Sequence, residues 1–344
     1  MLPKDYLAYR LSGSFCTDVS DASGMLLLDV KNRCWSKEMM DICGITEDKL
    51  PKLYESFEVV GTLKKEVADE LGFSENVKVI AGAGDNAAAA VGTGTVGDGM
   101  CNISLGTSGT IFISSNKFGV DENNALHSFA HADGHYHLMG CMLSAASCNK
   151  WWNEEILKTK DFAAEQDGII KLGENRVFYL PYLMGERSPL LDEKARGAFI
   201  GLSGGHGRGH LIRAVLEGVT YSQRQCVDVL RGMNVPTEEM MACGGGARSA
   251  FWRQMLADVY GCPIQTAKAA LEGPALGVAI LAGVGTGVYP SVESACDAIV
   301  KPDTVLYPDA ERSRAYEPYY RLYLRQYPAL RETFHALAAM RSRA

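Results

Sequence analysis

Short apolar runs alternate along the chain with longer segments in which apolar residues recur every three to four positions. The run at 76–82, NVKVIAG, is rich in β-branched residues and predicts a buried strand. The alanine-rich run at 85–94, DNAAAAVGTG, predicts a helix that ends at glycines. Amphipathic helices are predicted over 211–233 and 249–261. Strands that alternate with helices are typical of an α/β protein.

Two hairpins are predicted between these helices. Met100 to Gly106 and Thr110 to Ser115 read as short alternating strands, and Thr107, Ser108 and Gly109 separate them. The second hairpin, LHSFAHADGHYHLMG, contains Asp133-Gly134, a strong signal for a two-residue turn.

The length and composition predict two domains. A chain of 344 residues with 47% apolar content can form two ordinary cores. The helical pattern gives way to hairpins at Gly97 to Gly99. We therefore predict domains at 1–97 and 98–344.

Charge and cysteine use exclude several classes of protein. A net charge of −7 offers no broad basic surface for nucleic acid, so we expect a small-molecule partner. The ten cysteines form no C-x-x-C pair and follow no secretory leader, which predicts reduced thiols and a cytoplasmic protein. The longest apolar run, at 275–288, is glycine-rich and shorter than the about 20 residues that span a membrane.

Gly92, Gly94 and Gly97 spell G-x-G-x-x-G, the fingerprint of dinucleotide-binding folds. However, a predicted helix precedes them and a strand follows, which reverses the order that such a fold requires. We interpret them as a helix C-cap and a hinge between domains.

Four histidines are spaced like metal ligands: His127, His131, His135 and His137. A two-residue turn would pair Ala130 with His137 and place His127 and His131 on one face, and His135 and His137 on the other. Since they would not converge, we favour ordinary strand histidines over a zinc site.

A glycine-rich loop follows the apolar segment Met240–Cys243. Gly244, Gly245 and Gly246 come next, and Ser249 then begins a helix. Backbone without side chains lets a base or a phosphate approach closely, so the segment fits a nucleotide platform. A tight turn of any α/β domain is an equal alternative.

The turn SLGTSG has the character of a phosphate-binding loop. The backbone N–H groups of Gly106, Thr107, Ser108 and Gly109 can form an anion-binding concavity, to which the two hydroxyls can add donors. The alternative is an ordinary hairpin turn, for which Asn-Gly is commoner.

Asp85 lies between the end of a predicted strand and the start of a helix. In open α/β sheets this edge binds ligands. The alternative is a helix N-cap, for which both Asp85 and Asn86 are suited. Because two phosphate-type loops share the chain, we favour a general base that faces a γ-phosphate.

Two further segments carry a specific resemblance. The opening MLPKDYLAYRLSG, with Lys4 at the position of the signature's lysine, resembles one signature of the FGGY family of carbohydrate kinases, within the actin-like, sugar-kinase and Hsp70 superfamily. A second signature of that family is matched position by position, with seven residues between its halves, by Gly197, Phe199, Gly201, Leu202, His210, Leu211, Ala214, Val215, Leu216 and Glu217. The similarity extends from Met1 to about Tyr327.

The resemblance implies an α/β protein of two ribonuclease-H-like domains that close over a sugar and ATP. It is greatest to the members that phosphorylate D-xylulose on the 5-hydroxyl, with Mg²⁺ arriving on ATP. Gluconate, ribulose and glycerol are alternative substrates, although glycerol kinases carry Gln where this chain has Asn86.

Site residues follow from the same resemblance. Asp85 matches the catalytic base, and Asn86 would hold a sugar hydroxyl. Trp151 would flank the nucleotide, or else belong to the core. The residues that match ATP-binding motifs are Gly106, Thr107, Ser108 and Gly109 in a phosphate loop, and Gly244, Gly245, Gly246, Ala247 and Arg248 in an adenosine motif.

One departure from the family pattern affects the first domain. Family members begin with D-x-G-T-x-x-K, a first phosphate loop, and later carry a Met-His-Gly-like segment that touches the sugar; this sequence has neither. We therefore expect a first domain that is incomplete at its N-terminus and a chain that transfers phosphate poorly by itself. An inactive nucleotide-binding fragment, a missing N-terminal polypeptide and a homodimer are the alternatives that this leaves open.

Overall fold

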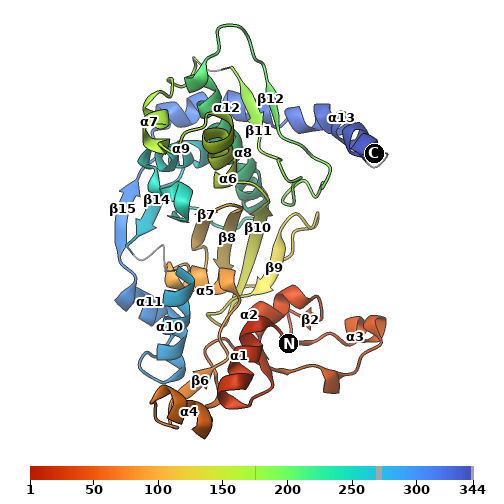
Figure 1. Cartoon of the computed structure of the whole chain (residues 1–344), viewed down its shortest axis with the longest axis vertical. Helices are drawn as coiled ribbons and strands as arrows, with labels where there is room; N and C mark the ends of the chain where they lie inside the picture. Colours follow the sequence, from red (N-terminus) through yellow and green to blue (C-terminus); the bar gives the residue numbers. More distant parts are fainter. Residues whose placement is uncertain (175, 269–272, 342–344) are drawn as a thin grey trace.

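The computed structural model describes residues 1–174, 176–268 and 273–341. A seven-stranded mixed sheet forms its centre, with one group of helices above it and the N-terminal part below it in Figure 1. In the order β15-β14-β13-β7-β8-β10-β9, the strands are Pro302–Leu306, Ile264–Ala267, Met240–Cys243, Cys101–Leu105, Gly109–Ser115, Tyr136–Met142 and His127–Ala130.

The topology of this sheet is that of a ribonuclease-H-like domain. β7, β8 and β10 form an antiparallel meander, and β13 and β14 continue it in parallel on the other side of β7. The predicted hairpin around Thr107–Gly109 and the predicted strand Met240–Cys243 are both confirmed.

Two long helices cover one face of the sheet and build its core. α8 spans Arg208–Gly232 and α9 spans Ala250–Tyr260, close to the predicted ranges. Ser249 accepts a hydrogen bond from the N–H of Trp252, and Gly261 ends α9 in the left-handed conformation. The fully buried Trp252 donates from Nε1 to Thr220 Oγ1 at 3.0 Å, which fastens α9 to α8.

Smaller elements complete the upper part of the molecule. They are α6 (Ala146–Trp151), a π-helical turn (Trp152–Ile156), α7 (Phe162–Asp167), β11 (Phe178–Leu180), β12 (Ala198–Ile200), α12 (Ala310–Tyr323) and α13 (Gln326–Arg341). Within the described ranges, no helix is both long enough and apolar enough to cross a membrane.

The N-terminal part consists of short elements. Its helices and strands are α1 (Pro3–Ser12), β1 (Cys16–Asp18), α2 (Val19–Ala22), β2 (Leu28–Asp29), β3 (Cys34–Trp35), α3 (Lys37–Cys43), β4 (Lys52–Tyr54), β5 (Val59–Thr62), α4 (Lys65–Leu71), β6 (Lys78–Ile80) and α5 (Asp85–Gly92). Its strands form three two-stranded sheets: β1 with β4, β2 with β3, and β5 with β6.

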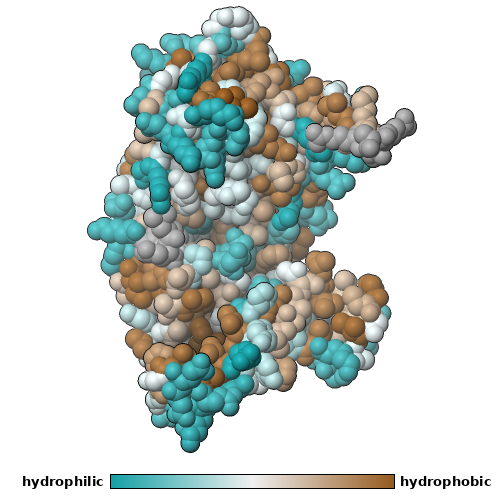
Figure 2. Space-filling view, in the orientation of Figure 1, coloured by the Kyte–Doolittle hydropathy of each residue, from teal (hydrophilic) through white to brown (hydrophobic). Residues whose placement is uncertain are grey.

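A strand does form within 76–82, but the prediction that it is buried is wrong. β6 is only three residues long, and Val77, just before it, is 40% exposed. Among the described strands β6 pairs with β5 alone, so one of its edges stays open. Other large apolar side chains of the N-terminal part are exposed as well, among them Leu26 and Ile42, and Figure 2 shows apolar surface over this lower part.

The second hairpin has a different register from the predicted one. Tyr136, rather than His137, pairs with Ala130, because the N–H of His131 bonds to the carbonyl of His135 and lengthens the loop. A shift of one residue exchanges the two faces of a strand. The rings of His131 and His137 therefore lie 5.6 Å apart, around Phe112, and the prediction that they occupy opposite faces is wrong.

Helix α5 is held by an unusually close contact with α10 (Gly273–Gly285), and α11 (Val292–Ile299) packs beside them. α5 ends at Gly92, as the sequence predicts. A Cβ at Gly92 would lie 1.8 Å from the carbonyl oxygen of Gly273, and one at Gly277 would lie 1.8 Å from that of Ala88. Only glycine allows the two backbones to approach this closely.

This contact gives a prediction for stability. Gly277→Ala should lower the free energy of unfolding by about 1–3 kcal/mol, because the methyl group must push α10 away from α5. The matched control is Gly232→Ala in α8, where an added Cβ meets no atom within 4 Å. Denaturant unfolding of both variants is the measurement, and equal stabilities would contradict the close-contact interpretation.

Candidate active site

Asp85 occupies the first turn of α5, at the end of the loop that follows β6. The N-cap position belongs to Gly84, so the alternative that Asp85 is the N-cap is wrong. Its Oδ1 accepts hydrogen bonds from the backbone N–H of Asn86 at 2.8 Å and from Asn86 Nδ2 at 3.0 Å. Both side chains are exposed, so the carboxylate keeps acceptor capacity for another molecule.

Asp85 and Asn86 line a cavity of about 70 Å³. β9 and β10 contribute Phe129, His137 and Met139 to its wall, and the segment around α2 contributes Ser20, Asp21 and Gly24. The sequence interpretation did not include the α2 segment. The only signal for it was the clustering of small and acidic residues in TDVSDASG.

The electrostatic character of this cavity is acidic. Burial raises the pKa of Asp21; Lys4 opposes the increase, and Asp18, Asp5 and Asp85 add to it. Two carboxylates, Asp21 and Asp85, thus face one small space. Carboxylates are suitable acceptors for the hydroxyl groups of a sugar.

The predicted phosphate loop and the glycine platform lie against each other. Between β7 and β8 the hydroxyls of Thr107 and Ser108 are exposed. A Cβ at Gly244 would lie 2.8 Å from the carbonyl carbon of Leu105 and 3.0 Å from the N of Gly106, so only glycine permits this approach. The start of α6 is tied to the same turn, because the N–H of Ala146 donates to the Gly106 carbonyl at 2.9 Å.

Strand β10 connects this turn to the Asp85 cavity. Met139 lines the cavity, and Met142 pairs with Gly109 at the turn. Three residues of β-strand span about 10 Å. Cys141 lies between them; burial raises the pKa of its thiol, and Asp85 adds a smaller contribution.

A second cavity, of about 280 Å³, opens beside the glycine platform. Its lining includes Gly244, Ala247, Arg248 and the cationic Lys268. Gly245 is exposed, and a Cβ placed there would meet nothing within 4 Å. The platform therefore presents open backbone beside basic side chains, which suits an anionic ligand.

Trp151 lies at the end of α6 and is half-buried. Its ring stacks on Tyr179, with centroids 6.5 Å apart, and packs against the main core. The contacts that the structure gives for Trp151 are core contacts, and its place beside a nucleotide stays a prediction.

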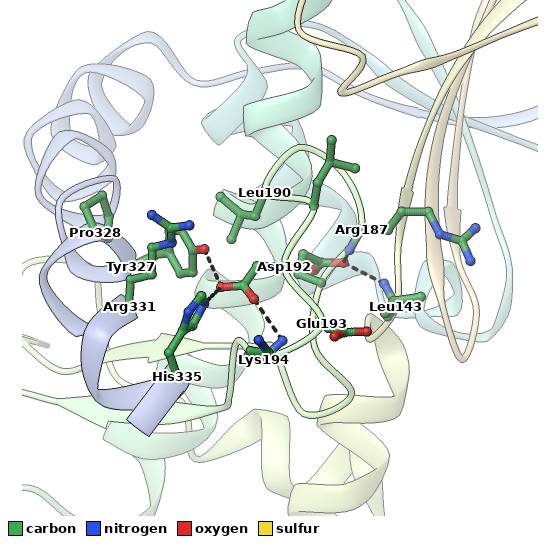
Figure 3. A pocket seen from close by; sticks show the side chains of 12 residues that line it. Leu143, Arg187, Leu190, Asp192, Glu193, Lys194, Tyr327, Pro328, Arg331 and His335 are labelled. Carbon is green, nitrogen blue, oxygen red and sulfur yellow. Dashed lines mark hydrogen bonds and ion pairs between the residues drawn. The ribbon is translucent and has the colours of Figure 1, made fainter. Parts of the chain in front are cut away.

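A larger cavity, of about 860 Å³, contains none of the predicted site residues. It lies between α13 and the loop that carries Asp192 (Figure 3). Asp192 accepts hydrogen bonds from the Tyr327 hydroxyl at 2.7 Å and from His335 Nε2 at 2.8 Å. Burial alone would raise the pKa of Asp192, but these bonds outweigh it and lower the pKa to about 2. This carboxylate therefore anchors α13 to the loop.

Glu186 begins that loop and is 2% exposed. Its Oε1 accepts hydrogen bonds from the N–H groups of Leu143 and Arg187, both at 2.8 Å, whereas Oε2 has no partner among the described residues. Burial raises the pKa of Glu186 to about 7, although those two bonds oppose the increase. Below about pH 7 the carboxyl group is thus favoured in its protonated form.

Comparison with known protein families identifies both the part of the chain that carries Asp85 and the part that carries the phosphate loop and the glycine platform. The N-terminal domain of the FGGY family of carbohydrate kinases matches residues 1–92, and the C-terminal domain of that family matches residues 101–286. The first match includes Asp85, and the second includes the predicted phosphate loop and the glycine platform.

Individual relatives agree with the family match. A xylulose kinase of Escherichia coli is 41% identical over 333 residues, which cover 96% of this chain and 68% of the relative. The crystal structure of a xylulose kinase from Brucella ovis has a TM-score of 0.90 at 35% identity, over 98% of this chain and 69% of that one. A gluconate kinase from Lactobacillus acidophilus has a TM-score of 0.91 at 28% identity, over 97% and 68%. The expected two-domain actin-like fold is confirmed by these similarities.

The protonated Glu186 predicts a specific pH dependence. Its folded pKa, about 7, exceeds the ordinary value of 4.5, so its contribution to stability is complete below pH 4.5 and is lost as the pH rises to 7. Glu186→Gln keeps the acceptor oxygen without a charge, so the free energy of unfolding should match the parent at pH 4 and exceed it by about 2–3 kcal/mol at pH 8. Denaturant unfolding at both pH values is the measurement. A difference between the two proteins that stays constant with pH would show that the fold does not raise the pKa of Glu186.

Proposed function

The chain belongs to the FGGY family of carbohydrate kinases, and we propose that it transfers the γ-phosphoryl group of ATP to the 5-hydroxyl of D-xylulose. One observation carries the proposal: a carboxylate-lined cavity and a turn suited to phosphate lie at the two ends of one short stretch of β10. The similarity to xylulose kinases supports the choice of sugar.

In the proposed reaction, Asp85 accepts the proton of the attacking hydroxyl while the oxygen attacks the γ-phosphorus in line. Phosphoryl transfer requires little covalent chemistry from the protein, so positioning and charge stabilisation dominate. The exposed carboxylate of Asp85, fixed by Asn86, supports this role. Asn86 and Asp21, which both line the cavity, are proposed to hold other hydroxyls of the sugar.

The nucleotide is proposed to bind along the turn and the platform. Its phosphates would accept hydrogen bonds from the backbone N–H groups of residues 106–109 and from the hydroxyls of Thr107 and Ser108. Its adenosine would lie against the glycine platform, where the backbone is open at Gly245, with Ala247 and Arg248 beside it. The cavity next to the platform and its basic lining support this assignment.

Mg²⁺ belongs to the proposal as part of the ATP complex. It would be held mainly by the phosphates of ATP and by waters. When bound, it neutralises charge on the phosphates.

The free thiols of all ten cysteines further support a reducing compartment such as the cytoplasm.

The choice of sugar is tested by measuring ADP release with a panel of sugars. We expect turnover to be low, as the sequence predicts for this chain by itself, and to be higher with D-xylulose than with gluconate, ribulose or glycerol. Gluconate is included because a gluconate kinase shares the fold at the same TM-score as the xylulose kinase of Lactobacillus acidophilus. Calorimetric titration with ATP, with and without sugar, identifies the alternative of a nucleotide-binding chain without turnover.

Asp85→Asn tests the base. We expect turnover to fall by about 100- to 10,000-fold, with ATP affinity and thermal stability unchanged, because asparagine keeps the shape but cannot take the proton. Asp309→Asn is the matched control, since Asp309 is likewise an aspartate at a helix N-terminus and accepts from the N–H groups of Glu311 and Arg312. Turnover within a few-fold of the parent for Asp85→Asn would show that another group is the base.

Gly245→Val tests the platform. The position is open, so the fold should tolerate the side chain, while the branched group would occupy the approach of the nucleotide. We expect weaker ATP binding, with D-xylulose binding unchanged. Gly204→Val, at another open glycine, is the control. Unchanged ATP affinity in Gly245→Val would remove this loop from the nucleotide site.

A further inference from the structure

A buried ion pair lies beneath the loop that carries Asp85. Lys4 Nζ is 2.8 Å from Asp18 Oδ1 and 2.7 Å from Asp5 Oδ1, and both carboxylates are almost completely buried. Burial works against the charged form of Lys4, but Asp18 and Asp5 outweigh it, so the pKa of Lys4 lies above its ordinary value. A buried carboxylate is costly without a partner, and Lys4 provides one for Asp18.

While Asp18 Oδ1 pairs with Lys4, the second carboxylate oxygen, Oδ2, accepts hydrogen bonds from hydroxyl groups. Asp18 Oδ2 accepts hydrogen bonds from Ser20 Oγ and, at 2.7 Å, from Ser56 Oγ. It also accepts from the backbone N–H of Ser20 at 2.9 Å. Hydrogen bonds to a charged acceptor are stronger than neutral ones, so both serines are firmly oriented.

These two serines hold the loop between β6 and α5. Ser20 Oγ accepts a hydrogen bond from the N–H of Gly84 at 3.0 Å, and the carbonyl of Ser56 accepts one from the N–H of Gly82 at 3.0 Å. Gly84 also touches α2 directly, because a Cβ there would lie 3.3 Å from the Cα of Asp21. The residue after Gly84 is Asp85, so the network ends one peptide unit from the proposed base.

We propose that Lys4, Asp18 and Ser20 are positioning residues for Asp85: the ion pair orients the Ser20 hydroxyl, which fixes the Gly84 amide and thereby the carboxylate that meets the sugar. This inference rests on the proposed role of Asp85. The loop at 81–84 has neither helix nor strand to hold it, so these hydrogen bonds set its conformation. The same network explains Lys4, a residue of the N-terminal family resemblance that the phosphoryl transfer itself does not use.

The position of Asp85 matters because the reaction rate depends steeply on the geometry of the reacting groups. A displacement of about 1 Å in a reacting group can cost about 100-fold in rate. Ser20→Ala removes the acceptor for the Gly84 amide and leaves Asp85, Asn86 and both nucleotide segments intact. We therefore expect kcat with D-xylulose to fall by about 10- to 100-fold, while KM for ATP changes by less than about 2-fold.

Ser23→Ala is the matched control for Ser20→Ala. Ser23 is a buried serine of the same segment whose Oγ donates to the carbonyl of Val19 and accepts from the N–H of Ala130, not from the Asp85 loop. Each variant loses one buried hydroxyl group that forms hydrogen bonds. Ser20→Thr keeps the hydroxyl and should restore the parent behaviour.

The experiment combines amide hydrogen exchange with kinetics. In Ser20→Ala, exchange at residues 82–86 should accelerate by about 10-fold or more, and in Ser23→Ala it should not. Unchanged exchange in Ser20→Ala, equal acceleration in both variants, or faster exchange with kcat intact would each overturn the proposal. The exchange result tests the support of the loop independently of the identity of the base, whereas full turnover in Asp85→Asn would overturn the assignment of Asp85 as the base.

Discussion

The pairing register of β13, β7, β8 and β10 fixes the relative positions of everything that the site uses. Cys243 at the end of β13 pairs with Ser104 of β7, and Gly109 at the start of β8 pairs with Met142 of β10. The glycine platform and the phosphate-type turn are therefore adjacent because their strands are adjacent. β10 then reaches about 10 Å further, to the Asp85 cavity. A change of register would separate these segments even if every loop kept its own conformation.

Asp85 depends on two further constraints outside the sheet. Helix α5 is held by its glycine contact with α10, a helix nearly 200 residues later in the sequence (Figure 1). The loop before α5 is held by Ser20 and Ser56. The base is thus fixed from one side by close backbone packing and from the other by a charged hydrogen-bond network. Rigid support of this kind is what a catalytic carboxylate requires.

Local signals in the sequence were enough for the elements that carry the nucleotide-type loops. The hairpin around Thr107, the strand before Gly244 and the helix that Ser249 caps each follow from residues that are neighbours in the chain. The register of the histidine hairpin was predicted wrongly because Asp133-Gly134 suggested a two-residue turn, whereas the bond from His131 to His135 makes a longer one. The wall formed by Ser20 and Asp21 could not be predicted, because it joins segments more than 60 residues apart through buried polar contacts that leave no periodic pattern.

The most direct test of this account is the structure of the protein with D-xylulose and a non-hydrolysable ATP analogue. An Asp85 carboxylate oxygen should lie within about 2.6–3.2 Å of the 5-hydroxyl. The analogue phosphates should lie at the Gly106–Gly109 turn, and the adenosine against Gly244 and Gly245. A sugar bound away from Asp85, for example in the large cavity beside Asp192, or a nucleotide that does not touch the glycine platform would contradict it.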